Sequence, residues 1–140
     1  MKGSCSLCDR RAIGLFGEEA VCDYLQSRGY GVVCRNFRTR GGEIDIIASN
    51  EDILAFVEVK TRPRDSLTSG FDAVNMAKRR RIVRTAIAYL STHKAELQPR
   101  FDVAQVTLAP MGRNTGRTLV VEDLSYLENA FDTTGLFMVL

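Results

Sequence analysis

The sequence is short of several residue types, and each shortage narrows its chemistry. Its 140 residues include one histidine, three prolines and no tryptophan. A single histidine excludes metal sites built from several histidines and any catalytic histidine pair. No stretch reaches the roughly 18 apolar residues that a membrane-spanning helix needs, and the first residues lack the apolar core of a signal peptide. We therefore expect no membrane partner, a cytoplasmic location, and chemistry based on acids, amines and hydroxyls.

Cysteine is also scarce, with four residues in the chain. That number does not build a disulfide framework in a reducing compartment. Cys5 and Cys8 form a C-x2-C pair, which is half of a typical zinc site, but Cys22 and Cys34 fall in a predicted helix and a predicted strand. Buried or incidental thiols therefore fit this spacing better than zinc does.

The rest of the composition is that of one globular domain, with 45% hydrophobic and 26% charged residues. A chain of this length can bury a core without disulfides. We expect a single domain over residues 1–140, with residues 1–9 and 133–140 as tails.

Hydrophobic periodicity predicts the order of elements. A 3.6-residue period indicates an amphipathic helix over residues 10–28, closed by Gly29. Short runs rich in Val, Ile and aromatic residues predict strands over 30–36, 43–48 and 53–61. A polar loop over 62–72 precedes a second helix of about 20 residues, and then come strands over 101–108 and 118–121 around a turn at 112–116, and a short helix over 123–131. The order α-β-β-β-α-β-β-α predicts an α/β fold with a mixed sheet flanked by helices.

The strongest chemical signal lies in the hairpin formed by the second and third strands. Because side chains alternate along a strand, Glu43 shares a face with Asp45, and Glu58 shares a face with Lys60. A register in which paired residue numbers sum to 103 places Asp45 opposite Glu58. The same register places Glu43 opposite Lys60, and a slip of one residue would separate the two sets. Cross-strand neighbours lie about 5 Å apart, which lets two carboxylates share one divalent cation.

Two facing carboxylates repel each other unless a cation or a proton neutralises them. Mg²⁺, or Mn²⁺ in its place, suits Asp45 and Glu58 because it prefers oxygen ligands and leaves positions for water and phosphate. Lys60 would then orient or deprotonate the attacking water and offset negative charge in the transition state. The alternative is a surface hairpin in which Lys60 forms ordinary ion pairs with Glu43 and Glu58.

Positive charge is concentrated in one segment. Residues 60–84 hold eight Lys and Arg against two Asp, whereas the remaining residues are acidic overall. Such a patch is typical of proteins that bind a polyanion, although a solvated helix face would have the same composition. The candidates for phosphate contacts are Arg62, Lys78, Arg80, Arg81 and Arg84. A second basic run comprises Arg35, Arg38 and Arg40. Asp102, in a later strand, fits a salt bridge with a neighbouring Arg better than it fits a role in the site.

These residues also resemble a known family. The spacing D-x12-E-x-K formed by Asp45, Glu58 and Lys60 resembles the PD-(D/E)XK signature of restriction-endonuclease-like folds. Five ordered blocks resemble the YraN-type family of bacterial proteins, predicted endonucleases that are similar to archaeal Holliday junction resolvases. The blocks are GLFGEEAVCDYLQSRGY, NFRTRGGEIDII, FVEVKTR, KRRRIVRTAIAYL and RFDVAQV, and the resemblance extends from about Gly14 to Asp132.

The resemblance implies roles for individual residues. Asp45 matches the metal-binding acid of the signature, Glu58 its second acid and Lys60 its lysine. Glu18 matches the helix acid of resolvase-like members, which would make it a third metal-site residue; periodicity alone does not separate it from Glu19. The proline that usually precedes the first acid of the signature is absent, and Ile44 stands in its place. For Glu43 two roles remain as alternatives, namely support of the metal and an ion pair with Lys60.

The resemblance and the hairpin together predict a Mg²⁺-dependent endonuclease that hydrolyses phosphodiester bonds in DNA, including branched or otherwise structured DNA. The alternative is a catalytically inactive nucleic-acid-binding or interaction module on the same fold. Because cutting two symmetric strands requires two sites related by a two-fold axis, we also expect a homodimer, formed through the C-terminal LFMVL or through an edge strand.

Overall fold

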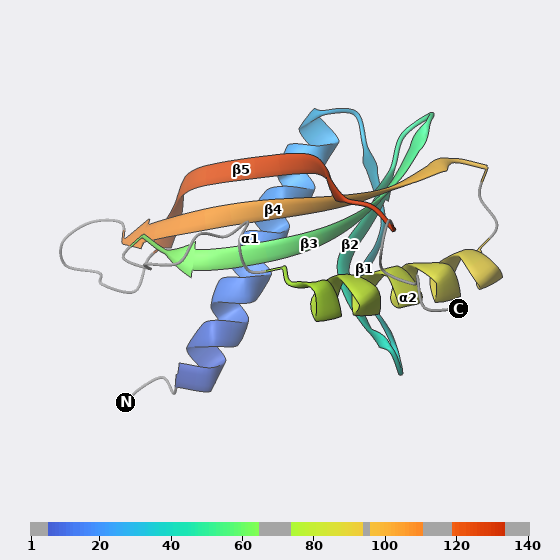
Figure 1. Ribbon diagram of the computed structural model, residues 1–140. Helices are drawn as coiled ribbons and strands as arrows, with labels where there is room; N and C mark the ends of the chain where they lie inside the picture. The colour runs from blue at the N-terminus through green and yellow to red at the C-terminus, as the bar shows by residue number, and fades with distance from the viewer. Residues whose placement is uncertain (1–5, 65–73, 94–95, 111–118, 134–140) are drawn as a thin grey trace.

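The computed structural model describes residues 6–64, 74–93, 96–110 and 119–133 of the chain. Its elements are α1 (Ser6–Ser27), β1 (Gly31–Thr39), β2 (Gly42–Ser49), β3 (Ile53–Pro63), α2 (Met76–Thr92), β4 (Gln98–Pro110) and β5 (Leu119–Phe131). They form one five-stranded sheet with two helices packed against it (Figure 1), which confirms the mixed α/β class. Neither helix in this part of the chain combines the length and the apolar character needed to cross a membrane.

The strands follow one another across the sheet in chain order. All neighbours are antiparallel except β3 and β4, which run parallel, and α2 lies in the connection that joins these two. Parallel neighbours need such a crossover, because a tight turn can only reverse the chain. Between β2 and β3, Ile46 faces Val57 and Ser49 faces Leu54, so the predicted register is confirmed.

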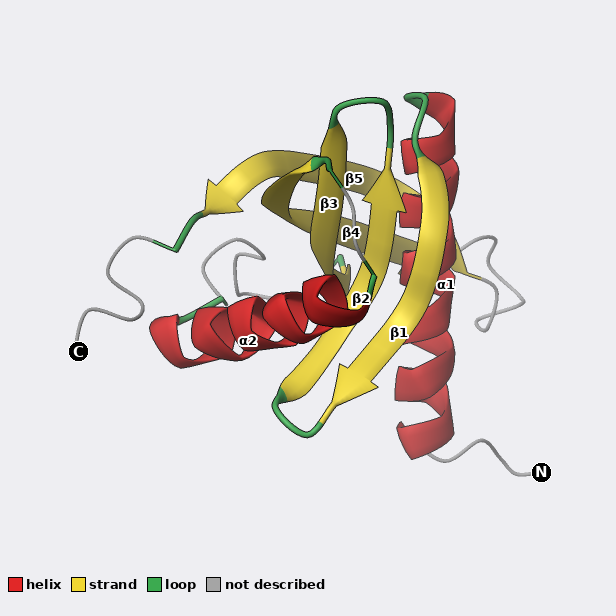
Figure 2. Ribbon diagram, turned by 90° about the vertical axis from the view of Figure 1, so that its right-hand side faces the viewer, coloured by secondary structure: helices red, strands yellow, loops and turns green. Residues whose placement is uncertain are grey.

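The two helices cover opposite faces of the sheet, and each face has its own apolar cluster (Figure 2). On the α1 face, Val21 and Leu25 pack against Val57 and Val106. On the α2 face, Val83 and Tyr89 pack against residues that include Phe56, Ile47 and Phe101. Burial on both faces explains why the central strands are hydrophobic almost throughout.

Local signals set the ends of the helices. At the end of α1, Gly29 adopts a φ of 90° and the N–H of Tyr30 donates to the carbonyl of Leu25, a hydrogen bond that closes the helix. At the start of α2, the Asn75 side chain accepts a hydrogen bond of 2.9 Å from the N–H of Lys78. The first helix begins at Ser6, earlier than the predicted start at residue 10.

The predicted last helix over residues 123–131 is wrong, because this segment continues β5 as a strand. Leu124 pairs with Val106 and Leu127 with Val103 on β4, with irregularities that keep the strand in contact over a long, bent path. Near its end, Asn129 adopts a φ of 53° and its N–H donates to the buried carboxylate of Asp102. These long-range partners outweigh the local helix preference. The predicted turn at 112–116, most of the loop at 62–72 and the C-terminal residues 134–140 lie outside the described residues.

Candidate functional site

The site lies at a fork in the sheet, where β2 and β3 separate. The two strands pair as far as Ile46 and Val57. Beyond that pair, β2 continues with β1 to Gly42, whereas β3 continues with β4 to Pro63, and Figure 1 shows the β1–β2 hairpin leading away from β3. Asp45 and Glu58 are the first residues past the last pair. Two carboxyl groups therefore enter the space between the arms from opposite sides.

The alternation of side chains in β2 is interrupted at Asp45. Ile44 belongs to the α2-face cluster and Ile46 to the α1-face cluster, although the two residues are separated by a single position. On β1, Arg35 pairs with Ile46, and Asn36, which follows it, adopts a φ of 55°. Unbroken alternation through β2, as predicted from the sequence, is therefore wrong at this residue.

Asp45 bridges the two arms of the fork. Its Oδ2 accepts a hydrogen bond of 2.8 Å from the backbone N–H of Val59. Burial raises the pKa of Asp45 to about 7, and the charge of Glu58 adds to this, while the Val59 hydrogen bond opposes it. A raised carboxyl pKa means that the ionised form lacks enough positive charge around it, so this position favours a cation or a proton.

Glu58 is buried and paired with Lys78, whereas the surface-hairpin alternative paired it with Lys60. Its Oε2 lies 2.6 Å from Nζ of Lys78, with the Glu58 side chain 8% exposed and the Lys78 side chain 32% exposed. Burial lowers the pKa of Lys78, but the hydrogen bond and charge of Glu58 outweigh it, so the pKa is raised overall. A surface pair between Glu58 and Lys60 is thus replaced by a largely buried pair with a residue from α2.

Lys60 and Glu43 lie further along the two arms. Burial lowers the pKa of Lys60, and the charge of Lys78 lowers it further. Glu43 pairs with Arg38 at 3.4 Å rather than with Lys60, and both of these side chains are well exposed. The structure therefore assigns Glu43 a surface partner on the β1–β2 hairpin.

Helix α1 brings Glu18 to the fork because Gly17 allows it to approach β3 closely. A Cβ built at Gly17 would lie 1.8 Å from Oγ1 of Thr61, so no side chain fits there. The Glu18 side chain is 13% exposed, against 61% for Glu19. Asn36 donates a hydrogen bond of 3.3 Å to Glu18, whose pKa is raised by burial. Glu18 therefore faces inward, as the family resemblance implied, and Glu19 faces outward.

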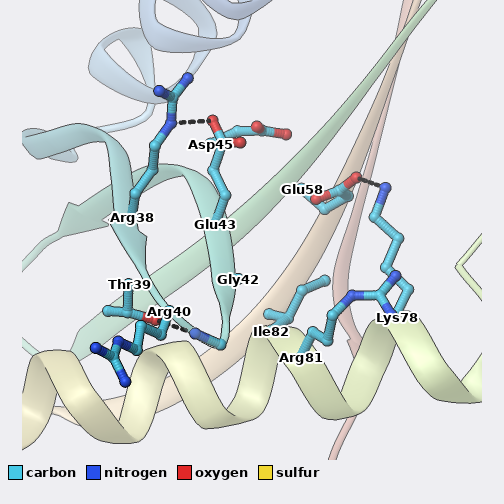
Figure 3. Close-up of a pocket in the computed structure, with 11 residues that line it drawn as sticks. Arg38, Thr39, Arg40, Gly42, Glu43, Asp45, Glu58, Lys78, Arg81 and Ile82 are labelled. Atoms are coloured by element: carbon cyan, nitrogen blue, oxygen red, sulfur yellow. Dashed lines mark hydrogen bonds and ion pairs between the residues drawn. The ribbon is translucent and has the colours of Figure 1, made fainter.

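Two cavities open from the fork on either side, and both are bordered by Asp45, Glu58 and Lys78. The hairpin-side cavity, of about 490 Å³, is completed by Arg38, Thr39, Arg40, Gly41, Gly42, Glu43, Arg81 and Ile82. The α1-side cavity, of about 560 Å³, is completed by Arg10, Ile13, Gly14, Glu18, Val59, Lys60, Thr61 and Pro63. In Figure 3 the carboxyl group of Asp45 extends from the hairpin toward Glu58, and the carboxyl group of Glu58 faces the ammonium group of Lys78.

The cavities separate the predicted phosphate-binding residues into two groups. Lys78 and Arg81 line a cavity, whereas Arg62, Arg80 and Arg84 line neither. Within the described part of the chain, no three acidic, histidine or cysteine side chains stand close enough together to hold a metal ion in their present positions. Asp45 and Glu58 thus border both cavities, Glu18 borders only the α1-side cavity and Glu43 only the hairpin-side cavity, and the group in contact with Glu58 is a lysine.

Asp102 lies outside the site and has a structural role, as its sequence context indicated. The residue is 1% exposed, and its two carboxylate oxygens accept hydrogen bonds of 2.9 Å from Arg100. A third hydrogen bond of 2.6 Å comes from the hydroxyl of Tyr126. This network joins β4 to β5.

Sequence reasoning did not single out Asn36, and it read Lys78 only as a phosphate ligand. One property of Asn36 could have indicated its special position, because asparagine tolerates a left-handed backbone better than most residues do. The partner of Lys78 carried no sequence signal, since its contact with Glu58 depends on how α2 packs.

Comparison with known proteins gives a consistent result. Residues 17–106 match the profile of a family described as "Uncharacterised protein family UPF0102". A UPF0102 protein of Symbiobacterium thermophilum is 44% identical over 104 residues, covering 74% of this chain and 88% of its own. A UPF0102 protein of Desulfosudis oleivorans is 42% identical over 127 residues, covering 90% and 94% of the two chains. One of Clostridium acetobutylicum is 40% identical over 119 residues, covering 84% and 92%.

Proposed function

The chain belongs to the uncharacterised family UPF0102, and from the chemistry of its site we propose that it is a Mg²⁺- or Mn²⁺-dependent nuclease that hydrolyses phosphodiester bonds in DNA. Membership confirms the YraN-type family expected from the sequence. The activity is our proposal. The observation that carries it is the pair formed by Asp45 and Glu58 at the fork, with Lys60 beside it and Glu18 behind it.

The residues at the fork fit a divalent metal with oxygen ligands. Asp45 and Glu58 provide two carboxylates, and Mg²⁺ commonly binds through one or two carboxylates and keeps several waters. The raised pKa of Asp45 records the repulsion and burial that a cation would relieve. Glu18, hydrogen-bonded to Asn36, suits a position that supports the metal's water ligands. A metal bound there would act as a Lewis acid and stabilise negative charge on the phosphoryl oxygens.

The remaining groups are suited to the other parts of the hydrolysis. The oxygen of a water molecule bonds to phosphorus, one phosphorus–oxygen ester bond breaks, and the leaving oxygen gains a proton. Lys60 borders the same cavity as the acids, and its lowered pKa brings it closer to accepting a proton from water at neutral pH than an exposed lysine. In its charged form it would offset negative charge in the transition state.

The basic residues around the hairpin-side cavity support a polyanionic substrate. Arg38, Arg40 and Arg81 surround the opening next to the acids. They would hold the phosphate backbone without reading its sequence, which fits a preference for DNA shape such as a branch or a junction. A homodimer with two such sites would cut both strands of a symmetric junction, which light scattering with and without DNA would test.

A metal-dependent cleavage screen tests the proposal. Linear duplex, flapped and four-way DNA are incubated with Mg²⁺, with Mn²⁺ and with a chelator, using wild type and Glu58→Gln. We expect cleavage of at least one substrate by wild type with metal, and none by the variant or with chelator. The inactive nucleic-acid-binding module would instead bind DNA and cleave no substrate under any of these conditions.

A further inference from the structure

Among the residues that the structure describes, Lys78 is the positively charged residue in direct contact with Glu58. Its Nζ lies 2.6 Å from Oε2 of Glu58, and the Glu58 side chain is almost fully removed from solvent. In Figure 3 the lysine extends from the beginning of α2 toward the carboxyl group of Glu58. The ammonium group of Lys78 therefore supplies positive charge next to the carboxylate of Glu58, which we propose as a metal ligand.

A backbone hydrogen bond at the start of α2 fixes the position of Lys78. Its N–H donates to the side chain of Asn75, the capping residue of α2, so Lys78 lies in the first turn of the helix at a set position. Two residues later the exposed Arg80 begins a different face of the helix, away from both cavities. The helix start thus presents Lys78 to the fork, whereas Arg79 packs over the ring of Phe131 and Arg80 is exposed.

The surroundings of Lys78 are unusual for a phosphate ligand. It borders both cavities, and its charge lowers the pKa of Lys60, the other lysine at the fork among the residues that the structure describes. Two neighbouring ammonium groups are unfavourable unless acids compensate them. Here Glu58 and the nearby charge of Asp45 do so. The pair of acids is therefore partly neutralised by the protein itself before any ligand binds.

We propose that Lys78 is a built-in counter-cation, which holds Glu58 in the metal-free protein and competes with a divalent metal ion for that carboxylate. This inference rests on the proposed metal site. An ammonium group and a divalent ion repel each other and are attracted to the same carboxylate, so each weakens the hold of the other on Glu58. Metal binding would release the ammonium group of Lys78 toward the adjoining hairpin-side cavity, which is the one we propose for the phosphate backbone.

Removing the ammonium group should therefore strengthen metal binding. Titration calorimetry with Mn²⁺ and with Ca²⁺ would compare wild type with Lys78→Met, which keeps most of the aliphatic side chain. Because the substitution frees a buried carboxylate from one competing ion pair, we expect the variant to bind metal roughly tenfold more tightly. Lys78→Arg keeps the charge and should bind like wild type.

Arg28→Met is the matched control for net charge. Arg28 lies after α1 and stacks over Tyr24 at 4.7 Å, and it borders neither cavity. It should leave metal affinity unchanged. Equal or weaker metal binding by Lys78→Met overturns the inference and leaves the proposed function intact. Absence of metal binding in both wild type and Lys78→Met overturns both.

A second measurement needs no metal. In the presence of a chelator, Lys78→Met should melt at a lower temperature than wild type, because the substitution leaves Glu58 without its partner. In a Glu58→Gln background the same substitution should have a much smaller effect. An equal decrease in both backgrounds would mean that Lys78 acts through packing, and the counter-cation role would be rejected. Lys78→Gln, which retains a polar side chain, serves if Lys78→Met does not fold.

Discussion

Asp45 and Val59 are joined across the fork by a hydrogen bond of 2.8 Å from the Val59 N–H to Asp45 Oδ2. The carboxylate replaces the backbone partner that β3 loses where β2 leaves it. One oxygen of Asp45 thus has a hydrogen-bond partner in the protein backbone. The relationship fixes the orientation of the acid in the site.

The pKa of Asp45 predicts how stability depends on pH. Its folded value is about 7, against 3.8 for an ordinary Asp, so between these values the folded protein holds a proton that the unfolded chain has lost. Stability should therefore fall as pH rises from about 4 to about 7. Asp45→Asn, which cannot ionise, should gain stability relative to wild type by a few kcal/mol at pH 8 and by little at pH 4. Urea unfolding in chelator at both pH values measures this, and an equal difference at the two would contradict it.

Lys60 and Glu58 should separate catalysis from metal binding. Lys60→Met should lower cleavage by roughly a hundredfold or more, because it removes the group that acts on water and on transition-state charge. It should still show the rise in melting temperature caused by Mn²⁺. Glu58→Gln should lose both, since its carboxylate is a proposed ligand. Loss of the metal-induced rise in Lys60→Met would show that the lysine supports the ion instead.

Gly17 should be intolerant of even one methyl group. Alanine there would place its Cβ 1.8 Å from Oγ1 of Thr61, so α1 has to move away from β3. We expect Gly17→Ala to cost about 1–3 kcal/mol and to weaken metal binding by displacing the neighbouring Glu18. Gly14→Ala is the control, because its Cβ would meet nothing within 4 Å and alanine favours a helix. Chemical unfolding distinguishes the two, and similar stabilities would argue against the close contact.

The basic rim of the hairpin-side cavity should determine DNA affinity. Arg40 and Arg81 line this cavity and are both exposed. Replacing both with alanine should weaken binding to all sequences alike and reduce the slope of log affinity against log salt by about 1–2. Fluorescence anisotropy over a range of salt concentrations measures the slope. A slope equal to that of wild type would remove these arginines from the contact surface.

Asp102 should matter for folding and not for the chemistry. It is buried and hydrogen-bonded to Arg100, Tyr126 and the backbone of Asn129. Asp102→Ala would remove the close, buried partner of Arg100 and leave the more distant Glu128 at 3.7 Å, and we expect a loss of roughly 3–5 kcal/mol in the free energy of unfolding. The fraction that remains folded should bind Mn²⁺ with wild-type affinity. A selective loss of metal binding without destabilisation would place Asp102 in the site.

The sequence by itself determined the α/β class, the register of β2 and β3, and the presence of two acids and a lysine in the hairpin that these strands form. Periodicity and turn residues are local properties, and the register follows because a slip of one residue would turn Ile46 and Val57 out of the core. Five ordered blocks also identified the family. These features depend on neighbours in the chain or on an unbroken pattern, so they can be read from the order of residues.

Tertiary structure alone decided the partner of Glu58, the interruption at Asp45 and the fate of residues 123–131. Lys78 is twenty residues from Glu58 in the chain, and only the packing of α2 brings the two together. The break in β2 depends on Asn36 in the neighbouring strand, and β5 is a strand because β4 and Asp102 provide its partners. In each case the deciding interaction is between residues that are distant in sequence, where local propensity carries no information.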